Sequence, residues 1–301
     1  MTRPAPDPAP PAAPPSRRAL LLGAGLLLGW PARAQPGAQP GARIASLGGA
    51  VTEILYGLGA APRIVAVDTT SLHPPEAMRE KPAVGYLRAL SAEGILSTRP
   101  DLVIAAEGAG PPDVLALVRE AGVRVEIVAE PPSAEGVLDK ILAVGRLAGL
   151  EREAQGIAAR VEAGFAALAA SRARVAAPVR ALVVLSLQNG RVMVGGRGST
   201  ADGMLALAGA RNAAEAVEGF KPITDEALIA AAPDVVVMMR TGHGEATPET
   251  VFAGPGLSRT PAAARRALVT MDGLALLGFG PRTPEAAGEL MRRFYPDLPR
   301  E

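Results

Sequence analysis

The chain has 301 residues, a formal net charge of +1 and no cysteine. The near-zero charge offers no electrostatic basis for binding nucleic acid or an anionic membrane surface. Without cysteine there is no disulfide framework, no thiolate metal site, no thiol nucleophile and no cysteine to carry a lipid anchor. The length suits one large domain or two lobes of about 130 residues each.

The first expected segment is an export signal at residues 1–34. Two adjacent arginines precede the apolar stretch Ala19–Trp30, which is shorter than the roughly 20 residues of a membrane span but suits a signal peptide. Small residues favour cleavage between Ala34 and Gln35. The paired arginines also resemble a twin-arginine signal, so both the Sec and the twin-arginine routes stay open. We therefore expect an exported, soluble, periplasmic product without membrane insertion, beginning with a flexible leader at 35–42.

From residue 43 the chain alternates β-rich and helical runs, which predicts βα units around mostly parallel sheets. The N-terminal lobe is expected at 43–132. Its expected strands are Arg43–Leu47, Ile64–Asp68, Asp101–Ala105 and Arg124–Val128, and its expected helices are Ala50–Leu58, Ala92–Ser97 and Asp113–Ala121.

A helical bridge is expected at 133–176. Apolar residues recur every three or four positions in Ala134–Ala148, and again from Glu151 to about Val175. A rigid bridge of this kind would allow only limited movement between the lobes.

The C-terminal lobe is expected at 177–301, and it completes an α/β fold of two Rossmann-like lobes. Its expected strands are Arg180–Leu187, Asp234–Met239 and Ala267–Met271, and its expected helices are Thr200–Ala208, Asp225–Ala231 and Pro284–Phe294.

One sequence pattern occurs twice, once in each expected lobe. Ser91 and Thr224 each precede a helical run and suit the N-cap position, where a side-chain oxygen accepts a first-turn N–H. Glu93 and Glu226 follow in the first turn, at the positive end of the helix dipole. Pro-Asp then precedes a strand in both copies. The duplication predicts two similar lobes that each present one acidic residue.

Several enzyme classes are not supported by the residues present. The chain has neither a phosphate-binding Gly-x-x-x-x-Gly-Lys-Ser/Thr motif nor the Gly-x-Ser-x-Gly turn of serine hydrolases. Its two histidines cannot form a three-imidazole zinc site. His73 suits a loop, whereas His243 follows an expected strand end, where ligands bind in α/β folds. We therefore expect no enzymatic activity, and a nucleotide-using enzyme is the least favoured alternative.

The segment Val84–Leu90 is the least regular part of the first lobe. If it is extended, Tyr86 and Arg88 point to the same side, and a nearby guanidinium favours a charged phenolate. Phenolate oxygen is an axial ligand for haem iron in some proteins. A half-buried tyrosine beside a surface arginine is the simpler interpretation of these residues alone.

The chain resembles the haem-binding periplasmic proteins of bacterial ABC importers over essentially all of Arg43–Pro296, most specifically in its Gly-Tyr-x-Arg segment. The similar segments are Arg43–Ala60, Val67–Ser71, Val84–Gly94, Glu107–Pro112, Gly195–Ser199 and Gly278–Arg282.

The resemblance implies class III periplasmic binding proteins, with two α/β lobes joined by a single long helix. It implies that Tyr86 is the axial ligand of ferric haem and that Arg88 supports the phenolate. It also implies that Glu93 and Glu226 dock into arginine pockets of a permease dimer. A corrinoid or a ferric siderophore is the alternative cargo for the same fold.

Haem carries two propionates, which call for arginines or backbone N–H groups. Arg240, at an expected strand end, and Arg197, in a glycine-rich turn, are the candidate partners. A solvated loop arginine is an equally good interpretation of each. His243 remains a candidate for contact with the haem.

Overall fold

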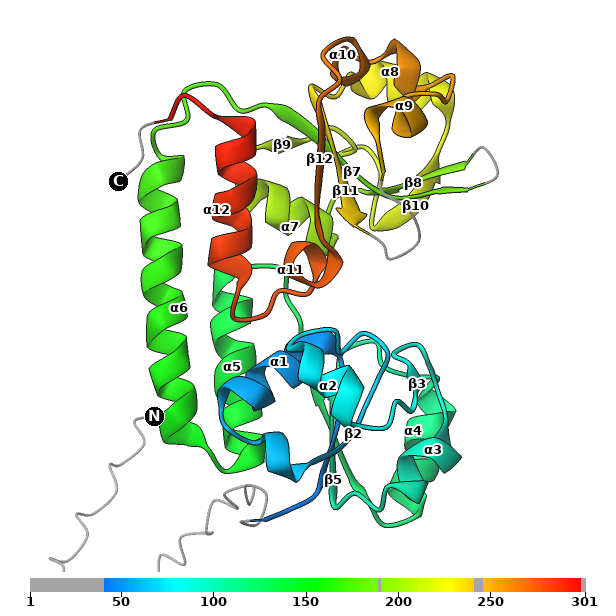
Figure 1. Cartoon of the computed structure of the whole chain (residues 1–301), viewed down its shortest axis with the longest axis vertical. Coiled ribbons are helices and arrows are strands. Elements are labelled where there is room, and N and C mark those ends of the chain that lie inside the picture. The colour runs from blue at the N-terminus through cyan, green and yellow to red at the C-terminus, as the bar shows by residue number, and fades with distance from the viewer. Residues whose placement is uncertain (1–40, 189–190, 241–245, 299–301) are drawn as a thin grey trace, which may run out of the picture. The chain divides into compact units, whose positions relative to one another are not determined.

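Two large β-sheets, each flanked by helices, and one two-stranded sheet lie in the part of the chain that the computed structural model describes, residues 41–188, 191–240 and 246–298 (Figure 1). The export signal expected at 1–34 and His243 lie outside these residues. Among the described helices, none has the length and apolar character needed to cross a membrane.

The N-terminal sheet has four parallel strands in the order β2-β1-β5-β6. All the strands expected from the sequence are present. The elements of this lobe are β1 (Ile44–Leu47), α1 (Gly49–Gly57), η1 (Ala61–Arg63), β2 (Ile64–Val67), α2 (Pro75–Glu80), β3 (Gly85–Tyr86), β4 (Ala89–Leu90), α3 (Ala92–Ser97), β5 (Leu102–Ala106), α4 (Pro112–Glu120) and β6 (Arg124–Val128).

The C-terminal sheet is mixed, with the order β10-β8-β7-β11-β12 and a short β9 beside β7. Strands β9, β7, β11 and β12 are parallel, whereas β8 runs antiparallel to both β7 and β10. The elements are β7 (Arg180–Gln188), β8 (Arg191–Gly195), α7 (Thr200–Leu207), β9 (Arg211–Asn212), β10 (Phe220–Ile223), α8 (Asp225–Ala231), β11 (Val235–Arg240), α9 (Pro248–Val251), η2 (Leu257–Arg259), α10 (Pro261–Ala264), β12 (Leu268–Asp272), α11 (Gly273–Leu277) and α12 (Thr283–Phe294).

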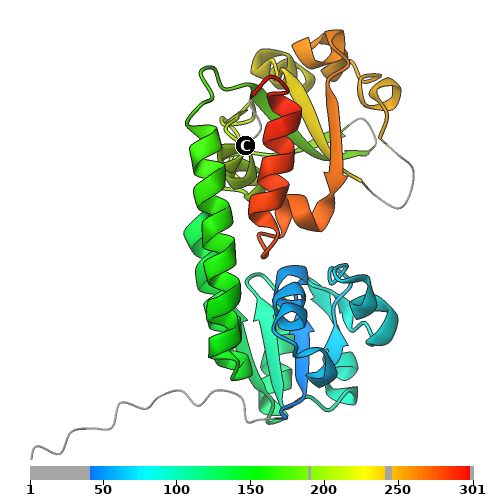
Figure 2. The same ribbon diagram turned by 60° about the vertical axis from the view of Figure 1, so that its left-hand side comes forward.

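Helices α5 (Ala134–Ala148) and α6 (Glu151–Arg172) connect the sheets and pack against each other. Gly149 ends α5 with a left-handed φ of 69°, which suits glycine and starts the turn into α6. The 22 residues of α6 extend about 33 Å at about 1.5 Å per residue. This long helix packs against α1 of the first lobe and α12 of the second (Figure 2). It ends at Arg172, three residues before the expected end.

Successive side chains of a strand point to opposite faces of the sheet, and here the two faces lie against different hydrophobic cores. In β5, Leu102 and Ile104 face a core shared with α5 and α6, whereas Val103 faces a second core under α4. The shared core continues into the C-terminal sheet through Val183, with Phe165 of α6 in the same cluster. One hydrophobic core therefore joins both sheets, which supports limited movement between the lobes.

Candidate functional site

Tyr86 lies in a short β-hairpin formed by β3 and β4, where it pairs with Ala89. Gly85 has a φ of 115°, and a Cβ there would lie 2.6 Å from the carbonyl oxygen of Ala89. Only glycine fits this approach without strain. Arg88 lies in the turn of the hairpin and not in a strand. The prediction that this segment is extended is therefore wrong, and the argument that Tyr86 and Arg88 share one side of a strand no longer applies.

The hairpin is held at the carboxyl edge of the N-terminal sheet by loops from two strands. The N–H of Thr69, after β2, donates to the carbonyl of Gly85 at 2.9 Å. Gly110, in the loop after β5, donates to Leu87 and accepts from the N–H of Leu90, both at 2.9 Å. These bonds satisfy the outward-facing backbone of the hairpin and fix its position on the sheet.

The side chain of Tyr86 is half exposed, with 50% of its surface accessible. No described residue forms a hydrogen bond or an ion pair with its hydroxyl. Ligands of α/β sheets bind beyond the carboxyl ends of the strands. The described residues contain no group of three or more His, Cys, Asp or Glu side chains suited to a metal ion. The Tyr86 oxygen is thus a free potential ligand at the edge where ligands bind.

The two candidate arginines of the second lobe are exposed but lie at different levels of the sheet. Val184 of β7 pairs with Val194 of β8 and with Met238 of β11, which marks a common level. From that level Arg240 lies toward the carboxyl end of β7. Arg197 lies in the opposite direction, because β8 is antiparallel. The structure therefore does not bring these arginines together.

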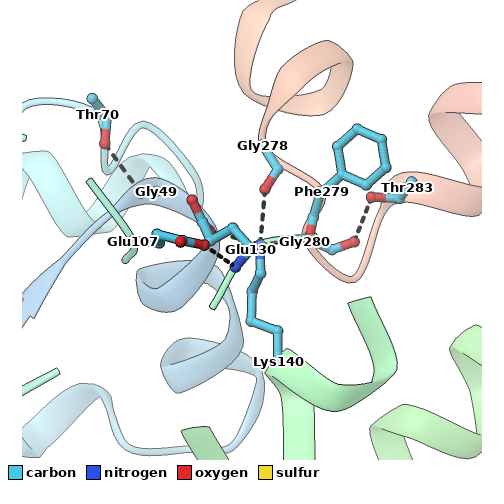
Figure 3. A network of polar contacts seen from close by, with 9 residues as sticks. All are labelled: Gly49, Thr70, Glu107, Glu130, Lys140, Gly278, Phe279, Gly280 and Thr283. Atoms are coloured by element: carbon cyan, nitrogen blue, oxygen red, sulfur yellow. Dashed lines mark hydrogen bonds and ion pairs between the residues drawn. The ribbon is translucent and has the colours of Figure 1, made fainter. Parts of the chain in front are cut away.

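A buried lysine connects the two lobes near the carboxyl edges of the sheets. Lys140 of α5 is almost completely buried, and its Nζ donates to Glu130 Oε1 at 2.7 Å. It also donates to the carbonyls of Phe279 at 3.1 Å and Gly278 at 3.4 Å, both in the segment after α11 (Figure 3). The N–H of Glu130 donates to Glu107, which follows β5. The lysine therefore has three acceptors from both lobes.

A second polar link joins α1 to the start of α12. Arg282 donates to both carboxylate oxygens of Glu53, at 3.0 and 3.1 Å. Glu53 is only 8% exposed. A bidentate pair of this geometry is the strong form of an arginine–carboxylate contact. The two links together fix how the lobes meet.

Sequence interpretation missed both links, although Lys140 left a signal. It is three residues after Val137 and four before Val144, so it lies within the apolar face of the expected helix. A charged residue inside such a face needs a buried partner. The partner of Glu53 is far along the chain and left no comparable local signal.

Glu93 and Glu226 occupy equivalent positions in the two lobes. Each lies exposed in the first turn of a short helix, after a capping Ser91 or Thr224 that accepts a backbone N–H. Hydrogen bonds from its own backbone N–H and from the Thr224 hydroxyl lower the pKa of the Glu226 carboxyl. The expected caps are confirmed, and both carboxylates are accessible from solvent.

The duplicated pattern also contains a structural contact that sequence interpretation missed. Asp101 accepts the N–H of Arg43 at 2.8 Å, and Asp234 accepts the N–H of Arg180 at 3.1 Å. The Arg43 side chain also donates to the carbonyls of Thr98 and Arg99, which directly follow α3. The Arg180 side chain donates to the carbonyl of Ala231, the last residue of α8. We call each of these Arg–Asp pairs an amino-edge clasp. The repeated Pro-Asp therefore closes the amino edge of each sheet.

A surface cavity of about 600 Å³ lies between α6 and α12, away from these residues. Its lining includes Leu168, Pro284 and Met291, and contains none of the site residues predicted from the sequence. This cavity has no place in the candidate site.

Comparisons with known proteins agree with the fold described above. The profile described as "Periplasmic binding protein" matches residues 44–274. The periplasmic heme-binding protein BhuT, solved in complex with two hemes, is 41% identical, with a TM-score of 0.80 over 86% of this chain and 99% of BhuT. The periplasmic heme-binding protein RhuT from Roseiflexus sp. RS-1, solved in apo form, is 40% identical, with the same TM-score and coverage.

A curated relative comes from Bacillus subtilis (strain 168). It is an uncharacterized ABC transporter substrate-binding lipoprotein, YvrC, and is 26% identical over 262 residues. The match covers 86% of this chain and 82% of YvrC.

Proposed function

Because the chain belongs to the periplasmic binding protein family, we propose that it captures haem outside the cytoplasm and delivers it to an ABC importer. The observation that carries this proposal is Tyr86, a half-exposed tyrosine on an anchored hairpin, whose hydroxyl bonds no described residue. Similarity to two proteins described as heme-binding, at 40% identity or more, supports haem as the cargo. No chemical transformation of the cargo is proposed.

In this proposal the phenolate oxygen of Tyr86 is the axial ligand of ferric haem, since tyrosinate oxygen is an established haem-iron ligand. Arg88, in the turn beside it, supports the bound phenolate as a nearby positive charge. Arg240 is the favoured partner for a propionate, because it ends β11 at the carboxyl edge. Arg197 belongs to a different level of the sheet and is the weaker candidate. The role of His243 stays a prediction.

The remaining proposals concern location and partner. The signal-like residues 1–34 and the family support export to the periplasm. Glu93 and Glu226 support docking on a permease dimer, because they are exposed and occupy equivalent positions in the two lobes. A pair of equivalent carboxylates suits a partner that presents two equivalent basic pockets.

A hemin titration of the purified mature protein tests the cargo and the ligand. We expect a phenolate-to-iron charge-transfer band, and the titration also gives the number of haems bound. Tyr86→Phe should remove that band and lower the hemin affinity by about 100-fold or more. Loss of an outer-shell partner typically costs about 10- to 100-fold, and loss of the ligand itself should cost more.

Tyr56→Phe is the matched control. Its hydroxyl is buried with no partner among the described residues, so its removal should leave haem binding unchanged. An unchanged ferric-haem spectrum and affinity in Tyr86→Phe would overturn the ligand assignment. Tight binding of a corrinoid or a ferric siderophore, with none of hemin, would reassign the cargo.

A further inference from the structure

The N-terminal sheet carries a completely buried carboxylate without a cationic partner among the described residues. Asp68 follows β2 and is 0% exposed. Its Oδ1 accepts the N–H of Gly48 at 2.7 Å and the Ser71 hydroxyl at 2.9 Å. Its Oδ2 accepts the N–H of Thr70 at 2.9 Å and the Thr70 hydroxyl at 2.6 Å. Four neutral donors therefore occupy both of its oxygens.

This network extends into the core of the lobe. The Ser71 hydroxyl lies 2.7 Å from that of Thr52 in α1, which lies 2.7 Å from the Ser46 hydroxyl in β1. The Thr70 hydroxyl also accepts the N–H of Gly49 at 3.1 Å (Figure 3). Burial of a carboxylate is costly unless its oxygens are hydrogen-bonded, as both are here. A fully satisfied polar network also specifies one arrangement, here of the loops after β1 and β2.

Thr69, which lies between Asp68 and Thr70, connects this network to the hairpin. Thr69 is flanked by Asp68 and by Thr70, whose N–H and hydroxyl both bond the carboxylate. Its own N–H donates to Gly85, the residue before Tyr86. A shift of the 68–71 loop would therefore move the attachment point of the hairpin and the tyrosine with it.

We propose that Asp68 is the positioning residue for Tyr86, holding its hydroxyl where the iron of the cargo binds. The inference rests on the proposed function. It assigns to a buried carboxylate, which cannot itself reach a ligand, the task of orienting the group that does. Outer-shell partners of this kind fix the orientation of first-shell ligands.

Asp68→Asn tests this proposal with nearly unchanged volume. An asparagine presents one acceptor oxygen and one NH₂ group, so either Gly48 or Thr70 faces a donor in place of an acceptor. We expect a folded protein whose hemin affinity falls by about 10- to 100-fold and whose phenolate-to-iron band shifts or weakens. In the haem-free protein, the amide hydrogen of Thr69 should exchange faster than in the wild type.

Two further variants make the result decisive. Thr70→Val removes the hydroxyl bond to Asp68 and should shift the band in the same direction, and it decides the question if Asp68→Asn does not fold. Asp101→Asn is the matched control, since Asp101 accepts a backbone N–H at the opposite edge of the same sheet. It should lower the melting temperature while leaving the band and the Thr69 exchange unchanged.

The outcomes separate this inference from the proposed function. A folded Asp68→Asn protein with wild-type affinity, band and Thr69 exchange would overturn the positioning role, as would an equal band shift in Asp101→Asn. If the wild type shows no phenolate band, or Tyr86→Phe retains it, the ligand assignment fails, and if the wild type binds no hemin, the proposed function itself fails.

Discussion

The two lobes are alike at the amino edges of their sheets and different at the carboxyl edges. At the amino edges, Arg43 with Asp101 and Arg180 with Asp234 form the same clasp. Each clasp joins the start of one central strand to the start of the neighbouring strand and to the end of the helix before that neighbour. Clasps of this type fix where a helix ends and a strand begins, which every βα unit needs. The duplicated part of the sequence is thus explained largely by folding.

Among the described residues, the carboxyl edges share no such contact. The first lobe carries the Asp68 network and the hairpin of Tyr86, whereas the second ends β11 with the exposed Arg240 and runs from β12 directly into α11. The described parts of the two lobes therefore differ at the edge where we propose that the cargo binds. If that proposal holds, specificity should depend on residues present in only one lobe.

The largest effect is expected when the equivalent carboxylates of both lobes are reversed in charge. In cells that contain the cognate permease, the double variant Glu93→Lys, Glu226→Lys should abolish haem uptake, because like charges would face basic pockets. Haem affinity should stay at the wild-type value. Glu162→Lys, an exposed site on α6, is the control. If either single variant alone retains full uptake, the lobes are not equivalent in docking, and loss of haem binding would contradict the assignment.

The next effect concerns the junction between the lobes. Lys140→Met should lower the free energy of unfolding by about 3 kcal/mol, the lower end of the range for broken buried pairs, because Glu130 is partly exposed. Urea denaturation measures the change. The double variant with Glu130→Gln should recover part of the loss, since no carboxylate is then left without its cation. A loss of less than about 1 kcal/mol in Lys140→Met would show that the link does not stabilise the junction.

The smallest effect tests whether the clasps are equivalent. Asp101→Asn and Asp234→Asn should each lower the free energy of unfolding by about 1 kcal/mol, the usual net value of one hydrogen bond. Asp234 also pairs with Arg265, but that arginine is exposed and should add little. Thermal and urea unfolding of both variants provide the comparison. A loss in one lobe more than twice that in the other would refute the equivalence.

The central strands could be predicted to within about two residues because they are short apolar runs flanked by turn residues. Strand β8 and its neighbour β10 at the edge of the sheet were missed. Asn189-Gly190, between β7 and β8, is a sequence typical of a hairpin connection and could have indicated the antiparallel partner. Pro222 argues against a strand at β10, although proline is tolerated at a sheet edge.

The site was harder to predict because its parts are distant in sequence. Tyr86 could be identified as a candidate ligand, but its hairpin depends on Thr69 and Gly110, which contact it from separate loops. The polar segment after β2 has the composition of an exposed loop, and Asp68 is buried only because Gly48 approaches it in three dimensions. Local sequence patterns carry no information about such approaches.

The anchored hairpin also has a consequence for the kinetics of capture. Its backbone bonds run to protein groups in the loops after β2 and β5, so contacts within the chain order this segment and association need not supply that ordering entropy. Encounter with haem then requires no rearrangement of the segment that carries Tyr86. Haem and other planar iron or cobalt complexes should accordingly differ mainly in their dissociation rate constants, with similar association rate constants.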